Sequence, residues 1–113
     1  MELDELTLYI GNKLLEMSAS DVELLHVEQK SKLVKRLVLC TASDCFHAKK
    51  MANLLKEDLK DNARCYHTDG IFKGDWIVLD FDEIVVHIFT KETRQKFSIE
   101  KLYKDAKNFV ELK

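Results

Sequence analysis

Residues 76–89 constrain the fold more than any other part of the chain, because they predict two β-strands in immediate succession. Residues 76–81 and 84–89 are both rich in β-branched and aromatic side chains, and Asp82 lies at the turn between them. Two such runs separated by a short polar turn are typical of a β-hairpin. Because the strands of a hairpin are antiparallel, the sheet must contain at least one antiparallel pair.

The same hairpin predicts which side chains share a face of the sheet. Successive side chains of a strand point to opposite faces, and a tight loop with an even number of residues fixes the register. One face should carry only aliphatic and aromatic residues, and we expect it to be core: Ile77, Leu79, Phe81, Ile84, Val86 and Ile88. The other face should carry a mixed set: Trp76, Val78, Asp80, Val85, His87 and Phe89.

The mixed face has two interpretations. A tryptophan flanked by polar groups is typical of a protein contact surface, in which Trp76 would be the anchor and Asp80 and His87 would orient the partner. Helices could equally cover this face, since many sheets carry helices on both sides, and Asp80 and His87 would then be satisfied inside the protein. The pattern alone favours neither interpretation.

Hydrophobic spacing predicts three helical regions around this hairpin. Apolar residues three or four apart predict helices at residues 2–17 and 43–61, the second of them capped by Ser43 or Asp44. From Lys91 onward the charged tail is also predicted to be helical. Its expected docking residues are Phe97, Ile99, Leu102 and Tyr103.

The remaining segments predict strands and loops. Strands are expected at residues 22–28, 37–40 and 64–67, and a glycine-containing loop at residues 69–74. The helix at residues 43–61 can make a parallel crossover between strands, whereas the hairpin is antiparallel. The predicted architecture is therefore α/β, a mixed β-sheet flanked by helices.

The composition favours one soluble domain over residues 1–113, located in the cytoplasm. Hydrophobic residues make up 46% of the chain, which is enough to build a core. No apolar run approaches the roughly 20 residues that cross a bilayer, and the acidic residues Glu2, Asp4 and Glu5 stand where a signal peptide would be basic. The net charge of −2 also argues against a dedicated nucleic-acid binder.

The three cysteines, Cys40, Cys45 and Cys65, are predicted to be reduced thiols, most of them small core residues. Cys40, Cys45 and His47 form a C-x4-C-x-H pattern, but a zinc site needs a fourth ligand and usually has closer cysteine pairs. A helix N-terminus favours a thiolate at Cys45, yet no other part of a cysteine-based catalytic site accompanies it. We therefore expect no catalytic residue, no metal and no cofactor.

The acidic turn of the hairpin gives the rival hypothesis. Asp80, Asp82 and Glu83 could hold divalent cations, as carboxylates do in metal-dependent nucleotidyltransferases. The sequence shows no upstream Gly-Ser turn to grip a triphosphate and no partnered carboxylate on a later strand. A solvated acidic turn is the preferred interpretation, and the nucleotidyltransferase-like enzyme is the alternative.

Four basic residues fall within a short segment: Lys30, Lys32, Lys35 and Arg36. They could contact phosphate if the partner is a ribonucleoprotein. For the free protein, the preferred interpretation is a solvated edge that protects a strand against aggregation.

At the hairpin the sequence resembles the ribosomal silencing factors, also called the Iojap-like family. The motif is GDWIVLDFDEIVVHIF at residues 74–89, a tryptophan strand ending in aspartate, an acidic turn, and a strand with V-V-H. The tail ETRQKFSIEKLY at residues 92–103 is similar to the closing segment of that family. The departures from the family pattern are Lys35, Arg36, Ala42, Phe46 and Asp82.

The resemblance implies a translation repressor that is not an enzyme and whose nucleotidyltransferase-like fold lacks the catalytic apparatus. It implies binding to the large ribosomal subunit through ribosomal protein L-fourteen, which blocks joining of the small subunit when nutrients are scarce. A minor contact with ribosomal RNA, and a monomer or weak homodimer with no membrane contact, complete this expectation. The match places Trp76, Asp80 and His87 in the contact, with His67 and Tyr66 from the neighbouring strand as further candidates.

Overall fold

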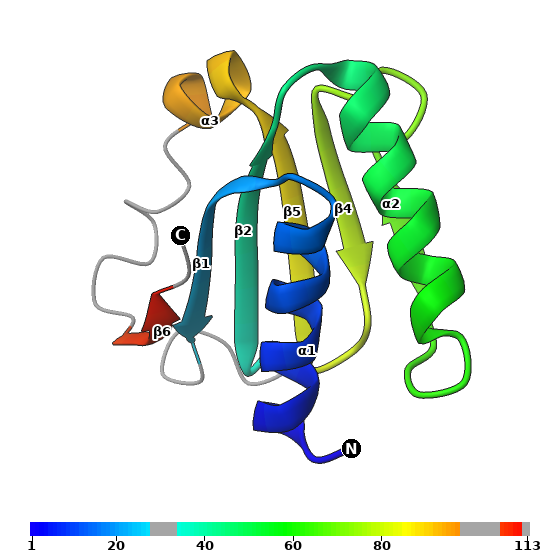
Figure 1. The fold of residues 1–113 in the computed structure, drawn as a ribbon, viewed down its shortest axis with the longest axis vertical. Coiled ribbons are helices and arrows are strands. Elements are labelled where there is room, and N and C mark those ends of the chain that lie inside the picture. The colour runs from blue at the N-terminus through cyan, green and yellow to red at the C-terminus, as the bar shows by residue number, and fades with distance from the viewer. Residues whose placement is uncertain (28–33, 98–106, 112–113) are drawn as a thin grey trace.

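A mixed β-sheet forms the centre of the molecule (Figure 1). The computed structural model describes residues 1–27, 34–97 and 107–111. In chain order the elements are α1 (Leu3–Glu16), β1 (Ser20–His26), β2 (Arg36–Ala42), α2 (Cys45–Leu59), β3 (His67–Asp69), β4 (Trp76–Asp80), β5 (Ile84–Thr90), α3 (Lys91–Phe97) and β6 (Lys107–Glu111). Within this described part, the sheet has six strands in the order β3-β4-β5-β2-β1-β6.

The strand directions confirm the predicted mixed α/β sheet. β2 and β5 pair in parallel, whereas the pairs β1–β2, β1–β6, β3–β4 and β4–β5 are antiparallel. The chain leaves β2 through α2 and returns at β3, which runs in the same direction as β2. The helix at residues 43–61 was expected to make this crossover, and α2 makes it.

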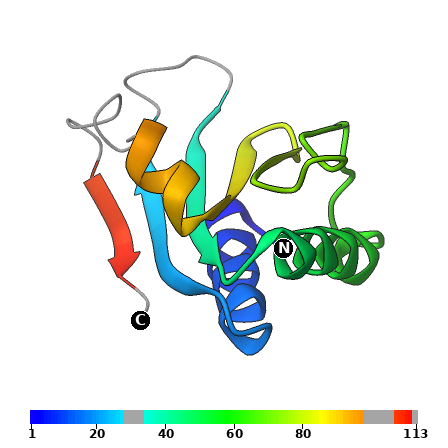
Figure 2. The ribbon, with the colours of Figure 1, turned by 90° about the horizontal axis from the view of Figure 1, so that it is seen from above.

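The face of the sheet that α1 and α2 cover holds the main core. In Figure 2, both helices lie on one side of the sheet and α3 lies on the other. The hairpin residues predicted to be core are all buried, with exposed fractions of 6% or less: Ile77, Leu79, Phe81, Ile84, Val86 and Ile88. They belong to one apolar cluster with Ile10 and Leu14 of α1 and Met51 and Leu55 of α2. This part of the sequence prediction is confirmed.

Of the two residues proposed to cap α2, Asp44 is the cap. Its Oδ1 accepts a hydrogen bond from the backbone N–H of His47 at 2.7 Å. This contact satisfies one of the backbone donors that the first turn of a helix leaves without a helical partner. Ser43 precedes the cap and instead donates its backbone N–H to Nδ1 of His47, in the first turn of α2.

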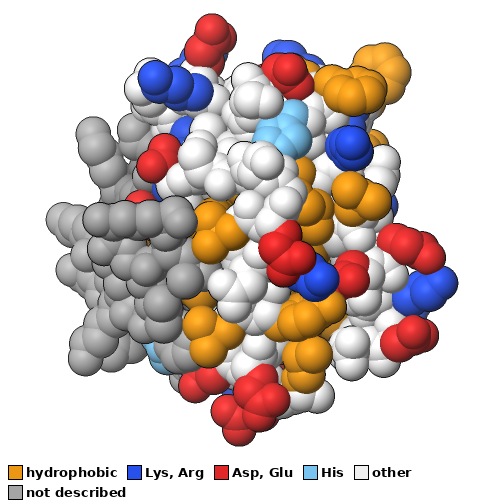
Figure 3. Space-filling model, viewed as in Figure 1, with side chains coloured by type: hydrophobic (Ala, Val, Ile, Leu, Met, Phe, Trp, Pro, Cys, Tyr) orange, Lys and Arg blue, Asp and Glu red, His pale blue; other side chains and the backbone are white. Residues whose placement is uncertain are grey.

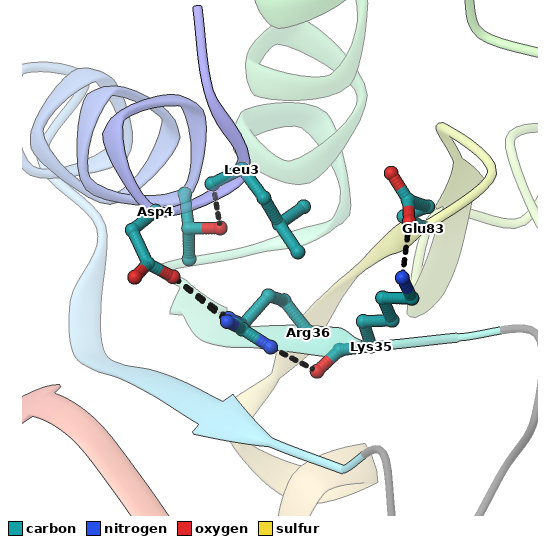
Figure 4. A network of polar contacts seen from close by, with 6 residues as sticks. Leu3, Asp4, Lys35, Arg36 and Glu83 are labelled. Atoms are coloured by element: carbon teal, nitrogen blue, oxygen red, sulfur yellow. Dashed lines mark hydrogen bonds and ion pairs between the residues drawn. The ribbon is translucent and has the colours of Figure 1, made fainter.

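Arg36, at the start of β2, is buried and ion-paired (Figure 4). Its Nη2 and Nε donate to Oδ1 of Asp4 on α1 at 2.8 and 3.1 Å, and its Nη1 donates to the Lys35 carbonyl at 2.9 Å. Lys35 is paired with Glu83, with the Nζ and Oε2 atoms 3.0 Å apart. The prediction of a solvated strand edge is therefore wrong for Arg36, because β2 lies between β1 and β5 inside the sheet.

The strand expected at residues 64–67 lies further along the chain, at His67–Asp69. Tyr66 already donates its N–H to the Asp80 carbonyl at 2.8 Å, but the regular ladder runs from His67 opposite Asp80 to Asp69 opposite Val78. Among the strands that the structure describes, β3 pairs only with β4, so its position is set by where β4 ends. Local sequence does not contain that information.

The described parts of the tail are one helix and one strand. α3 ends at Phe97, and Lys107–Glu111 forms the strand β6 along β1. The prediction of a wholly helical tail is wrong here, because the free edge of β1 accepts another strand. Several predicted residues lie outside the described part of the chain: Lys30, Lys32, Ile99, Leu102 and Tyr103. The structure does not describe the side chain of Phe97.

The cysteines differ in burial more than the sequence predicted. Cys40 is fully buried in β2, and burial raises the pKa of its thiol to about 12. Cys45 and Cys65 are only partly buried, so the expectation that most of the cysteines are core residues is wrong. In the described residues, no helix is long and apolar enough to span a membrane.

Candidate functional site

The candidate site is the face of the β4–β5 hairpin that points away from α1 and α2. The strand register pairs Trp76 with Phe89, Val78 with His87, and Asp80 with Val85. These six residues therefore share a face, as the hairpin pattern predicted. β3 extends the same face, because His67 is the partner of Asp80.

This face is only partly covered. The helix on this side, α3, follows β5 directly and contacts β5 and β2. A small second core forms here, with Leu25, Val27, Leu37, Leu39 and Phe89 buried together. Toward the β3–β4 edge the side chains are half-buried or exposed: Trp76, Val78, Asp80, Val85, His67 and Asp69. Of the two interpretations of this face, the structure favours the open one over β4, since α1 and α2 cover the opposite face.

Three aromatic rings form a connected group on this face. The rings of Trp76 and Phe89 stack with their centroids 5.2 Å apart, and those of His87 and Phe89 stack at 5.8 Å. The indole Nε1–H of Trp76 donates a hydrogen bond to Nδ1 of His87 at 2.9 Å. The buried Phe89 thus forms a base on which the other two rings are held in fixed positions.

The imidazole of His87 is neutral in this arrangement. An indole N–H can only donate, so Nδ1 must accept, and the ring proton resides on Nε2. Only 9% of His87 is exposed, and burial lowers the pKa of its imidazole to about 4. The hydrogen bond and the burial both favour the uncharged ring at neutral pH.

Asp80 lies at the end of β4, between this face and the acidic turn. Its Oδ1 accepts a hydrogen bond from the backbone N–H of Asp82 at 2.8 Å. Asp82 has a positive φ of 76°, which an aspartate tolerates better than most residues. The Asp80 side chain therefore helps to shape the turn while remaining partly exposed to solvent.

His67 and Tyr66 extend the site at the edge of the sheet. His67 is exposed, and its Nε2 lies 3.3 Å from Oδ2 of Asp69. Tyr66 is 59% exposed, and the guanidinium of Arg64 lies 4.9 Å from the centre of its ring. The structure thus brings together Trp76, Asp80, His87 and His67 on one face and places Tyr66 at its border.

The acidic turn does not gather its carboxylates around a common point. Asp80 caps the turn, Glu83 pairs with Lys35, and Asp82 is exposed at the tip. Across the described ranges, no group of three or more His, Cys, Asp or Glu side chains could hold a metal ion. The geometry therefore gives no support to the nucleotidyltransferase alternative.

His47 serves the packing of the helices. Its Nδ1 accepts the Ser43 backbone N–H at 3.0 Å, and its Nε2 lies 2.7 Å from the Met17 carbonyl at the end of α1. Because both ring nitrogens are engaged, this histidine links the start of α2 to the end of α1. The C-x4-C-x-H pattern therefore marks a structural contact.

Sequence reasoning did not single out Arg94 of α3. Its guanidinium is buried, with Nη1 donating to Oγ1 of Thr41 at 2.9 Å and Nη2 lying 3.3 Å from Oε1 of Glu23. Nη1 also donates to the Asp21 carbonyl. These contacts fasten α3 to β1 and β2 on the side of the sheet that carries the site. The only signal in the sequence was the position of Arg94 in the tail segment at residues 92–103, which is similar to the closing segment of the family.

Two exposed aromatic residues were also missed as surface features. Phe46 in the first turn of α2 is 78% exposed, and Phe72 in the β3–β4 loop is 94% exposed. A side chain at Gly74 would lie 2.9 Å from the Cys45 carbonyl, so this loop packs closely against the first turn of α2. Gly74 also has a positive φ of 80°, which glycine adopts without strain.

Comparison with solved structures supports the fold. A crystal structure of a Chromobacterium violaceum protein superposes with a TM-score of 0.88 and 24% identity, over 92% of this chain and 88% of that one. A Bacillus halodurans crystal structure gives a TM-score of 0.79 and 23% identity, over 88% of this chain and 94% of that one.

Comparison of sequences identifies the family. The ribosomal silencing factor of Haemophilus influenzae is 28% identical over 88 residues, covering 77% of this chain and 86% of the relative. That of Bacillus subtilis is 26% identical over 89 residues, covering 78% of this chain and 75% of the relative. Residues 2–113 match the family described as ribosomal silencing factor during starvation. The chain therefore belongs to the ribosomal silencing factor family.

Proposed function

We propose that this chain binds the large ribosomal subunit at ribosomal protein L-fourteen and sterically blocks joining of the small subunit. Translation would thereby be repressed in the cytoplasm when nutrients are limiting. Family membership supports the ribosome as the target. The observation that carries the proposal is the partly open hairpin face, where a half-buried tryptophan lies beside acidic and imidazole side chains.

The charges of this face suit a protein partner. Asp80 and the neighbouring Asp69 contribute carboxylates around the aromatic group, and the imidazole of His87 is uncharged. A ribosomal protein binds RNA and is expected to be basic, so it complements these carboxylates. Phosphate would be repelled by them, which makes any contact with ribosomal RNA a minor one. On the helix side of the molecule, by contrast, acidic and basic side chains are interspersed (Figure 3).

The size of the chain suits steric exclusion. A standard interface buries about 800 Å² on each partner. The accessible surface of this chain is 6778 Å², so most of it would project from the subunit after binding. No chemical step is required for this action, and the proposal assigns the chain no catalysis, cofactor or membrane contact. A monomer is sufficient for it, and a weak homodimer would have to leave the hairpin face free.

The proposal is tested by measuring large-subunit binding and subunit joining together. Purified large subunits are co-sedimented with the natural chain, and joining with small subunits is followed by light scattering. Trp76→Ala and Val78→Lys alter the hairpin face, whereas Leu54→Ala alters an exposed residue of α2 on the other side of the sheet.

We expect the natural chain and Leu54→Ala to bind and to reduce joining. The two hairpin variants should bind at least tenfold more weakly while remaining folded by circular dichroism. A natural chain that does not sediment with large subunits would refute the proposal. Equal binding by all variants would show that the contact lies outside the hairpin face.

A further inference from the structure

The two nitrogens of the His87 ring have very different surroundings. Nδ1 accepts the Trp76 indole N–H at 2.9 Å, which places the ring proton on Nε2. Within the described residues, Nε2 has no hydrogen-bond partner. His47 provides the contrast inside the same chain, because both of its ring nitrogens are engaged.

An unpaired donor at this position is costly for the free protein. Only 9% of His87 is exposed, so water has limited access to its ring. A buried donor without an acceptor loses its hydrogen bonds to water and gains none in return. His87 lies on the partly open face. For a bound partner to remove that deficit, its acceptor must reach Nε2 through the small exposed part of this residue.

The His87 ring is also held in one orientation. It stacks on Phe89 with an interplanar angle of 12°, and the indole of Trp76 fixes the nitrogen on its other edge. A 180° flip of the ring would break the Trp76 hydrogen bond. A donor held this firmly loses little conformational entropy when a partner binds.

We propose that the Nε2–H of His87 is a recognition donor whose hydrogen bond goes to an uncharged acceptor on the partner, a main-chain carbonyl oxygen. This inference rests on the proposed function and specifies the chemistry of the contact. A lysine or arginine cannot accept this hydrogen bond, and a phosphate would approach Asp80 and Asp69 unfavourably. Trp76 has a positioning role here, because it fixes which nitrogen of His87 carries the proton.

Two variants separate the roles of the two ring nitrogens. In His87→Asn, the amide oxygen lies near the position of Nδ1 and can accept from Trp76, but the outer donor is lost. In His87→Gln, the longer side chain places an amide near the position of Nε2. Trp76 is the only tryptophan, so its indole ¹H–¹⁵N signal reports the inner hydrogen bond without ambiguity. Binding is measured by co-sedimentation with large subunits and by titration with isolated ribosomal protein L-fourteen.

We expect His87→Asn to keep the indole signal near its natural shift and to bind both targets about tenfold more weakly. His87→Gln should move the indole signal and retain more of the affinity than His87→Asn. Unchanged affinity in His87→Asn, with the natural chain binding normally, would overturn this inference and leave the proposed function intact. If His87→Asn binds the large subunit more weakly but binds isolated ribosomal protein L-fourteen as tightly as the natural chain does, the assignment of a carbonyl acceptor on that protein is overturned. Absence of binding by the natural chain would refute the proposed function itself.

Discussion

The two faces of the β4–β5 hairpin differ in polarity and in how fully they are covered. Toward α1 and α2, Leu79 and its neighbours are fully buried and entirely apolar. On the opposite face, Val78 and Asp80 are half-buried, and the aromatic group includes a polar hydrogen bond. Alternation along two strands thus gives one face to the stability of the fold and leaves the other partly open, where the proposed function places the partner. Each prediction below changes one face and measures whether the other is affected.

The largest effect is expected from the covered face. Leu79→Ala should lower the free energy of unfolding by about 2–5 kcal/mol, because it removes fully buried methyl groups and leaves a cavity. Val78→Ala, one residue away on the open face, should cost less than about 1 kcal/mol. Urea denaturation of both variants gives the comparison. Similar losses for the two would show that the faces are not distinct.

The next largest effect is the pH dependence of stability that arises from His87 on the open face. His87 has a pKa of about 4 in the folded chain, against 6.5 in the unfolded chain. Above pH 6.5 the ring is neutral in both states, so its full contribution to stability is present. As the pH falls from 6.5 to about 4, only the unfolded chain takes up the proton, and stability decreases by at most about 3 kcal/mol.

Urea denaturation at several pH values measures this dependence, and His87→Gln is the control. Between pH 6.5 and 4, the free energy of unfolding should decrease less in His87→Gln than in the natural chain. The decrease that comes from protonation of carboxylates should be the same in both. If the free energy of unfolding falls equally steeply with pH in the natural chain and in the variant, the burial of a neutral imidazole is contradicted.

A smaller effect is expected from the aromatic group. Trp76→Phe keeps a ring on Phe89 but removes the donor to His87, leaving Nδ1 without its partner. We expect a loss of about 1–2 kcal/mol in the free energy of unfolding. A double-mutant cycle with His87→Phe isolates the pair. A coupling energy near zero would show that the indole–imidazole hydrogen bond adds nothing to stability.

The smallest effect is expected at the turn. Asp82→Gly should stabilise the chain by up to about 1 kcal/mol, since glycine adopts the φ of 76° without steric cost. The gain is limited because glycine also has more freedom in the unfolded chain. Thermal melting measures the change, with Asp82→Ala as the control that should destabilise. Destabilisation by glycine would mean that the Asp82 side chain has a role in the turn that its exposure does not suggest.

The hairpin could be predicted from sequence because its register depends on local alternation and a short turn. Trp76 lies opposite Phe89 and Val78 opposite His87, as this reasoning requires. The hydrogen bond between Trp76 and His87 could not be predicted, because it joins diagonal neighbours and depends on side-chain orientation.

Features that depend on segments far apart in the chain could not be predicted from local sequence. Arg36 appeared to belong to a basic surface cluster because its partner, Asp4, lies 32 residues away on α1. β6 was missed because a short strand forms only where an edge such as that of β1 is free. Whether helices also cover the mixed face of the hairpin was undecided, since sheets with helices on one face or on both are reasonable until the whole sheet is placed.

Hydroxyl-radical footprinting of the natural chain, free and bound to large ribosomal subunits, tests the central claim most directly. Oxidation is quantified by mass spectrometry at residues on both sides of the sheet. We predict that binding protects Trp76 and Tyr66 and leaves Leu54 of α2 as reactive as in the free chain. Protection of Leu54 together with unchanged oxidation of Trp76 would contradict the assignment of the open hairpin face as the ribosome-binding surface.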